Sequence, residues 1–161
     1  MTHTSTPDIR AERIAVFAGS FNPFTAGHAD IVSRGLELFD RIIVAVGVNA
    51  AKNPGAIPAA LEPIRELYAG EDRVTVKAYS GLTAEFARGE GACALLRGVR
   101  SVRDFEYERD MADINRRLTG IDTVLLTARP DLGAVSSSLV RELDSLGVDT
   151  SPFMPHNDNT L

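Results

Sequence analysis

Short apolar runs rich in β-branched residues alternate with stretches of helical periodicity along the chain. Residues 41–48 (RIIVAVGV) form a nearly continuous apolar run, as expected of a parallel strand covered on both faces. Residues 27–39 instead place apolar or small side chains at the spacing of one helix face, namely Ile31, Val32, Gly35, Leu36 and Phe39. Alternation of this kind predicts a parallel sheet with helices on both faces.

The same pattern predicts five strands and five helices. The strands are expected over residues 13–18, 41–48, 73–78, 93–97 and 121–127. The helices are expected over residues 27–39, 61–68, 83–88, 101–118 and 137–146. Pro63 falls in the first turn of the second helix, where proline is tolerated. We therefore predict an α/β fold, a Rossmann-like doubly wound five-stranded parallel sheet in a single domain. In such sheets the ligand lies beyond the carboxyl ends of the strands, where the strand order reverses.

The two ends of the chain differ from this pattern. Residues 1–12 are polar and contain no apolar segment of the kind that a secretory signal needs, so we expect a disordered arm. Residues 13–150 are the expected domain, and residues 151–161, with two prolines, are expected to form a loose tail. No apolar stretch approaches the roughly 20 residues of a membrane span, so we expect no membrane partner and a cytoplasmic location.

Composition and charge restrict the function further. The chain has 161 residues, 44% of them hydrophobic, and a net charge of −5. This charge argues against a general nucleic-acid binder, which needs a basic face. An anionic ligand would require cations concentrated at one place. Cys93 is the only cysteine, so no internal disulfide is possible, which suits a reducing cytosol. Its apolar neighbours predict a small, buried strand residue.

The end of the first strand carries the first candidate site, Gly19-Ser20 followed by Thr25-Ala26-Gly27-His28 at a helix start. Free amides at a helix start favour bound anions, and glycine lets a ligand approach the backbone. Ser20 adds a hydroxyl and His28 a ring nitrogen around the same place. A plainer alternative is that Thr25 only caps the helix and His28 lies on the surface. The full strand–turn–helix combination is more specific than an isolated glycine motif.

Thr25-Ala26-Gly27-His28 resembles the (His/Thr)-x-Gly-His signature of the nucleotidyltransferase superfamily. The resemblance implies that this segment, with the Ser-Phe-x-Pro before it, binds the phosphates of ATP, with Ser20 and His28 on the α-phosphate and Phe21 beside them. An attacking phosphate is already an anion, so positioning and charge stabilisation are sufficient without a general base or a covalent intermediate. A helix start disfavours a protonated imidazole, so we expect His28 to donate in its neutral form.

Two further segments resemble the phosphopantetheine adenylyltransferases of bacterial type. Lys52-Asn53-Pro54 matches their Lys-x-Pro after the second strand, although the helix start that follows departs from the family pattern. Residues 97–108 match their Arg-Gly-x-Arg-x-x-x-Asp-Phe-Glu-Tyr-Glu stretch. Arg97 also ends an apolar strand, and its guanidinium suits a phosphate. The resemblance implies that Lys52 and Arg97 bind the phosphate of phosphopantetheine and that Ser20 also contacts this substrate, with Thr83 and Asn115 along the pantetheine arm. The implied ATP contacts are Gly98, Val99, Arg100 and Glu108.

Three serines precede the last helix. One of them is expected to cap it, because serine is a good N-cap residue. The other hydroxyls and the free amides suit a phosphate. Residues 135–138 resemble the family's Ile-Ser-Ser-Ser/Thr motif, which implies that Val135, Ser136, Ser137 and Ser138 hold the β- and γ-phosphates. No carboxylate, histidine or cysteine cluster has metal-ligand spacing, so Mg²⁺ is expected to be carried with ATP.

The resemblance therefore implies transfer of an adenylyl group from ATP to 4′-phosphopantetheine, in coenzyme A biosynthesis. The expected catalytic residues are His28, Ser20, Lys52 and Arg97, and a homohexamer is expected by the same resemblance. Two alternatives stay open. Asn22 is more usual in nicotinate-mononucleotide adenylyltransferases than in the phosphopantetheine enzymes. The second alternative is a non-catalytic nucleotide-binding protein with the same fold, which would have lost the hydrogen-bond donors at the reacting centre.

Overall fold

A computed structural model describes residues 10–49, 51–52 and 55–156. Its five strands form one parallel sheet in the order β3-β2-β1-β4-β5. The strands are β1 (Ile14–Gly19), β2 (Arg41–Gly47), β3 (Val74–Tyr79), β4 (Ala94–Val99) and β5 (Asp122–Thr127). The predicted fold is confirmed. Because β1 is flanked by β2 on one side and β4 on the other, the strand order reverses between β1 and β4.

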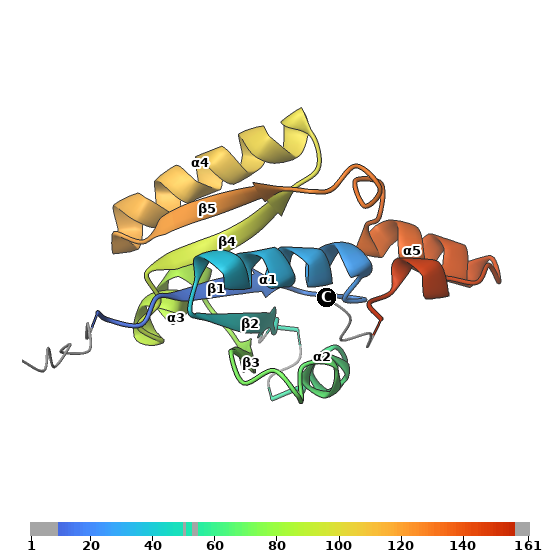
Figure 1. Ribbon diagram of the computed structural model, residues 1–161, viewed down its shortest axis with the longest axis horizontal. Helices are drawn as coiled ribbons and strands as arrows, with labels where there is room; N and C mark the ends of the chain where they lie inside the picture. Colours follow the sequence, from blue (N-terminus) through green and yellow to red (C-terminus); the bar gives the residue numbers. More distant parts are fainter. Residues whose placement is uncertain (1–9, 50, 53–54, 157–161) are drawn as a thin grey trace, which may run out of the picture.

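Five α-helices follow the strands in the order that the sequence predicts. They are α1 (Ala26–Leu38), α2 (Leu61–Leu67), α3 (Thr83–Gly89), α4 (Val102–Thr119) and α5 (Ser137–Ser145). All element boundaries lie within one or two residues of the predicted ones. The expected loose tail contains one turn of 3-10 helix at Ser151–Phe153, beside α5, which projects to one side of the sheet (Figure 1). Residues 1–9 of the expected arm and 157–161 of the tail lie outside the described residues.

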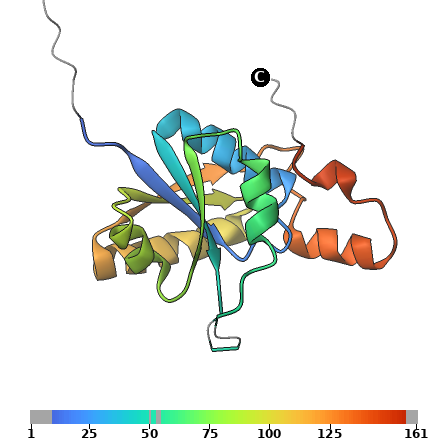
Figure 2. The same ribbon diagram turned by 90° about the horizontal axis from the view of Figure 1, so that it is seen from below.

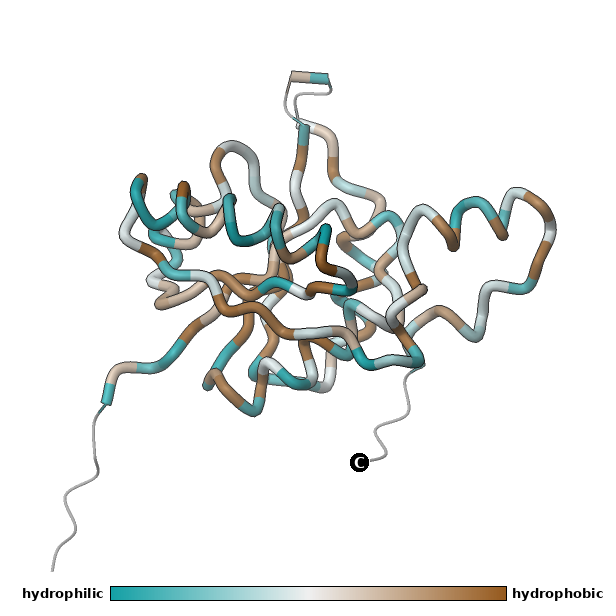
Figure 3. The backbone as a smooth tube through the Cα atoms, turned by 90° about the horizontal axis from the view of Figure 1, so that it is seen from above, coloured by the Kyte–Doolittle hydropathy of each residue, from teal (hydrophilic) through white to brown (hydrophobic). Residues whose placement is uncertain are grey.

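The sheet is covered on both faces, as Figures 1 and 2 show. On one face α1 and α2 bury one apolar cluster, which includes Val32, Ile42, Ile64 and Leu96. On the other face α3 and α4 cover a smaller cluster, which includes Val16, Ile43 and Leu95. The hydrophobic segments gather in the middle of the molecule, along the strands (Figure 3). Within the described residues, no helix has both the length and the apolar character needed to cross a bilayer.

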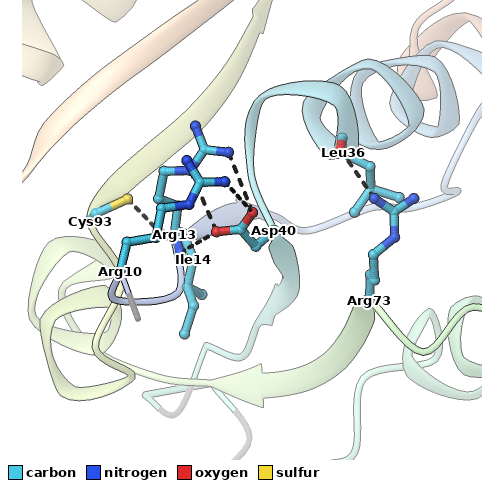
Figure 4. A network of polar contacts seen from close by, with 7 residues as sticks. All are labelled: Arg10, Arg13, Ile14, Leu36, Asp40, Arg73 and Cys93. Atoms are coloured by element: carbon cyan, nitrogen blue, oxygen red, sulfur yellow. Dashed lines mark hydrogen bonds and ion pairs between the residues drawn. The ribbon is translucent and has the colours of Figure 1, made fainter. Parts of the chain in front are cut away.

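The structure corrects the prediction for Cys93, which lies at the amino-terminal edge of the sheet. The residue precedes β4 and is exposed, not buried within the strand. Its thiol donates to the carbonyl of Ile14 over 3.3 Å, next to a charge cluster in which Arg10 and Arg13 pair with Asp40 (Figure 4). The hydrogen bonds from Arg13 hold the pKa of Asp40 below its usual value. The apolar run 92–96 misled the prediction because only its last three residues enter the core.

Gly35 allows α1 to lie close to the sheet. A Cβ atom at this position would stand 2.6 Å from both Ile42 Cδ1 and Leu96 Cδ2, and these two side chains are fully buried. Helix α1, which carries His28, can therefore approach the sheet closely only because Gly35, two turns after His28, has no side chain. Close packing of this kind leaves no room for a larger residue.

We expect the substitution Gly35→Val to destabilise the protein by about 1–3 kcal/mol, the usual cost of overpacking a filled core. The measurement is the free energy of unfolding in urea. Gly70→Val is the matched control, because a Cβ at Gly70 meets nothing within 4 Å. Equal stability of the two variants would contradict the close approach of α1.

Candidate active site

A cavity of about 390 Å³ opens at the carboxyl ends of β1 and β4, where the strand order reverses. This is the place that the fold class predicts for a ligand. The cavity is lined by the ends of both strands, the start of α1, the start of α4 and the segment before α5. Among the residues expected in the site, it collects Ser20, Phe21, His28, Arg97, Gly98, Arg100, Glu108, Val135, Ser136, Ser137 and Ser138.

The His28 ring is fixed by the backbone of the residue that begins the helix. Thr25 is the N-cap of α1 and is buried. Its backbone N–H donates to His28 Nδ1 over 2.9 Å, and its hydroxyl lies 3.1 Å from the same nitrogen. A peptide N–H can only donate, so Nδ1 must be an acceptor, and the neutral ring carries its hydrogen on Nε2. The geometry thus fixes the tautomer and leaves Nε2–H available as a donor.

Three aromatic rings surround His28. The ring centroids of Phe21, Phe24 and Phe17 lie 5.1, 5.3 and 6.1 Å from that of His28. The pKa of His28 is lowered to about 4, mainly by burial and in addition by the positive charges of Arg100 and Arg97. The predicted neutral form is therefore confirmed, but burial among the rings is its main cause, whereas the sequence argument relied on the helix start.

Arg97 and Glu108, which both line the cavity, form a bidentate ion pair. Arg97 Nη2 and Nε lie 2.7 and 3.0 Å from the two carboxylate oxygens, and Glu108 is 7% exposed. The third guanidinium nitrogen donates to the carbonyl of Ala18 over 2.6 Å. Sequence reasoning placed Arg97 on one substrate and Glu108 on the other, and it missed that each residue holds the other. Glu108 is the buried partner, so removing Arg97 would leave a nearly buried carboxylate without its counter-charge, which is costly.

A second, smaller cavity of about 190 Å³ shares Ala18, Arg97 and Glu108 with the first. Thr83 and Asn115, the two residues expected along the pantetheine arm, line it. Thr123 also lines it, and Thr123 Oγ1 is the one buried side-chain oxygen or nitrogen in the described chain without a hydrogen-bond partner. An unpartnered buried hydroxyl is costly unless a ligand satisfies it.

The three serines before α5 have different roles. Ser136 is the N-cap and accepts from the backbone N–H of Leu139, as expected of one serine. Ser137 donates its hydroxyl to the carbonyl of Pro23 over 2.7 Å, and Ser138 accepts from Arg141. The hydroxyl hydrogens of Ser136 and Ser138 therefore remain available for a ligand, whereas that of Ser137 is used to hold the segment before α1.

Two expected site residues lie outside the cavities. Lys52 is exposed on the loop after β2, where its backbone N–H donates to Asn49, and it lines neither cavity. Val99 is buried within β4 and also lines neither. Asn53 and Pro54, which follow Lys52 in its motif, lie outside the described residues. The first cavity thus assembles the predicted nucleotide contacts except Val99, whereas Lys52, a predicted phosphopantetheine contact, lies outside both cavities.

Sequence reasoning missed several residues that line the first cavity. Thr25 and His28 have the spacing of a capping box, S/T-x-x-E/Q, with histidine in place of the acid or amide, and this could have revealed their contact. Asp104 pairs with Arg100 at the mouth of the cavity, four residues away on α4. Leu132 lines it from the segment before α5, with no motif to indicate it. Among the described residues, no three His, Cys, Asp or Glu side chains are grouped to hold a metal ion.

The chain is similar to proteins of known activity. A family model described as cytidylyltransferase-like matches residues 16–143. Phosphopantetheine adenylyltransferase of Porphyromonas gingivalis is 52% identical over 145 residues, which cover 89% of this chain and 95% of that protein. The same enzyme of a Nocardioides species is 46% identical over 142 residues, or 88% of this chain and 89% of that protein.

Among solved structures, the bifunctional NMN adenylyltransferase/ADP ribose pyrophosphatase of Francisella tularensis has a similar fold. The TM-score is 0.65 and the sequence identity 14%, and the match covers 93% of this chain and 46% of that one. The present chain therefore spans about half of that two-activity protein. At this low identity the similarity concerns the fold alone.

The low pKa of His28 predicts a stability effect with a definite sign. An unfolded histidine takes up a proton near its ordinary pKa of about 6.5, whereas the folded ring resists protonation down to about 4. The contribution of His28 to the free energy of unfolding is therefore fully present above the pKa of the unfolded state, and it is lost as the pH falls toward the pKa of the folded state. Between about pH 7.5 and pH 5 we expect the wild type to lose about 2 kcal/mol more than the variant His28→Gln.

Urea unfolding at both pH values measures this difference. His156→Gln is the matched control, since His156 is exposed, and it should keep the pH dependence of the wild type. The burial argument is contradicted if His28→Gln and the wild type lose the same stability on acidification.

Proposed function

The chain belongs to the phosphopantetheine adenylyltransferases of the cytidylyltransferase-like family, and from this premise we infer that it joins ATP to 4′-phosphopantetheine. The products are dephospho-coenzyme A and pyrophosphate. The observation that best supports this reaction at the atomic level is the pair of adjoining cavities that share Arg97 and Glu108. One cavity has a neutral imidazole donor and serine hydroxyls, and the other has an unsatisfied hydroxyl beside Thr83 and Asn115.

The reaction forms one bond and breaks one. A phosphate oxygen of phosphopantetheine attacks the α-phosphorus of ATP, and the bond to the bridging oxygen of the β-phosphate breaks, releasing pyrophosphate. The nucleophile is already an anion, so no side chain has to remove a proton from it. Catalysis then depends on holding the two substrates in line and on stabilising charge at the α-phosphoryl oxygens.

We propose that His28 supplies that stabilisation through Nε2–H, with Ser20 beside it. A neutral donor suits this position, because it binds a phosphoryl oxygen without giving up a proton to it. Two arginines near the ring already supply positive charge, and a third charge there would repel them. The proposed ATP contacts are Ser20, Phe21, His28, Gly98, Val99, Arg100, Glu108, Val135, Ser136, Ser137 and Ser138.

For the second substrate we propose Ser20, Lys52, Thr83, Arg97 and Asn115 as contacts. The shared position of Arg97 supports this, because a guanidinium between the cavities can bind an acceptor phosphate that faces the ATP. The free hydroxyl of Thr123 suits an amide group of the pantetheine arm. Lys52 is exposed and would have to reach the phosphate from its loop.

We propose that Mg²⁺ enters with ATP, where it neutralises charge on the leaving pyrophosphate. The donor set of the cavity fits this, because hydroxyls and two carboxylates that are already paired with arginines, Asp104 and Glu108, can contact water molecules of the ion without replacing them. A homohexamer in the cytoplasm is proposed as well. Exposed apolar side chains on α4, such as Val102 and Tyr107, are compatible with self-association. One free cysteine in the described chain requires no oxidising compartment.

The test of the reaction is pyrophosphate release from Mg-ATP with purified protein. We expect turnover with 4′-phosphopantetheine and none with nicotinate mononucleotide, and we expect EDTA to abolish it without unfolding the protein. Turnover with the mononucleotide alone would contradict the proposed acceptor. ATP binding without any pyrophosphate release would instead favour a non-catalytic nucleotide-binding protein.

The variant His28→Ala should lose about 10²–10³-fold in kcat, the usual effect of removing a donor at the reacting centre. Its circular dichroism spectrum should match that of the wild type, because the helix retains its other contacts. His156→Ala, at an exposed histidine, is the control and should keep full activity. Near-normal turnover by folded His28→Ala protein would exclude the proposed role.

A further inference from the structure

The segment between β5 and α5 forms part of the wall of the first cavity. Ala128, Leu132 and Val135 line the cavity from this segment. Two successive turns shape it, because Leu132 N–H donates to the Arg129 carbonyl over 2.9 Å and Val135 N–H donates to the Leu132 carbonyl over 3.0 Å. The position of Leu132 and Val135 therefore depends on where Arg129 is held.

Arg129 is held by Asp30, a carboxylate on α1 two residues after His28. Arg129 Nε lies 3.0 Å from Asp30 Oδ1, and Asp30 Oδ2 accepts from Arg34 over 3.0 Å. The Asp30 side chain is only 10% exposed. Arg34 also donates to the carbonyl of Thr127, the last residue of β5, over 2.8 Å. One turn of α1, from Asp30 to Arg34, thus anchors both the end of β5 and the beginning of the following segment.

The far end of the segment has separate anchors. Ser137 donates to the carbonyl of Pro23, and Arg141 donates to that of Asn22. These bonds hold the start of α5 but do not reach the first turn of the segment. The Arg129–Asp30 pair is therefore the side-chain contact, among the described residues, that ties this first turn to α1.

We propose that Arg129, acting through Asp30, is a positioning residue for the nucleotide. It holds the turn that presents Leu132 and Val135 to the cavity as an apolar wall for the purine base of ATP. Hydroxyl and imidazole donors in the same cavity suit the phosphates, whereas apolar side chains suit the faces of a base. This inference rests on the proposed function, since it takes ATP as the ligand of this cavity.

We expect removal of Arg129 to have a modest effect, because its side chain is 61% exposed and exposed ion pairs contribute little free energy. Removing Arg129 also leaves Asp30 paired with Arg34, so no buried charge is left alone. For Arg129→Ala we expect the KM for ATP to rise roughly threefold to fivefold. The KM for 4′-phosphopantetheine and the kcat should change by less than about twofold.

The test compares Arg129→Ala with Arg129→Lys, which keeps the charge and should restore at least half of the loss. Arg109→Ala is the matched control, because Arg109 is about as exposed as Arg129 but pairs with an exposed carboxylate, Asp110 on α4, and should behave as the wild type. Calorimetry with the non-reactive analogue α,β-methylene-ATP should show the same rise in Kd as in KM. In the double variant with Asp30→Asn, the change at Arg129 should have no further effect.

An unchanged Kd for the analogue in Arg129→Ala would overturn the proposal. So would an equal rise in both KM values together with a lower Tm, which would indicate a merely structural role. If the wild type released no pyrophosphate with phosphopantetheine, the proposed reaction would fail. The calorimetric comparison would still decide whether Arg129 positions the nucleotide.

Discussion

The hydrogen bond from the backbone N–H of Thr25 to His28 Nδ1 sets the chemistry of the site. It fixes which ring nitrogen carries the hydrogen, because a backbone N–H can only donate and Nδ1 must therefore accept. The Phe17, Phe21 and Phe24 rings then remove the imidazole from water, so the neutral form is stable far below neutral pH. The neutral state and the tautomer of the His28 ring are thus set by the fold itself.

The charged side chains of the first cavity are likewise oriented by contacts within the protein. The chain is acidic overall, yet Arg97 and Arg100 both reach the first cavity, each paired with a carboxylate that orients it. Donors that are already oriented lose little free energy to reorganisation when a phosphate arrives. Arg97 and Glu108 line both cavities, so a change in this ion pair would alter the walls of both. In the proposed role, Arg129 likewise orients the segment that lines the first cavity before α5.

The fold and much of the site could be predicted from sequence, because local patterns carry them. The β-branched run 41–48 and the Gly-His helix start are local features, and both were interpreted correctly. The contact between Arg97 and Glu108 and that between Asp30 and Arg129 could not be found in this way. They join residues on different elements, and no spacing along the chain indicates them. Cys93 was placed wrongly because an apolar run does not show where burial begins.

The state of the His28 ring tests this account most directly. In protein labelled with ¹⁵N at histidine, the imidazole nitrogen shifts can be followed from about pH 7.5 to pH 4. We expect a neutral ring with hydrogen on Nε2 and none on Nδ1, which begins to titrate only near its pKa of about 4. Titration near the ordinary value of about 6.5, or a hydrogen on Nδ1 at neutral pH, would contradict it.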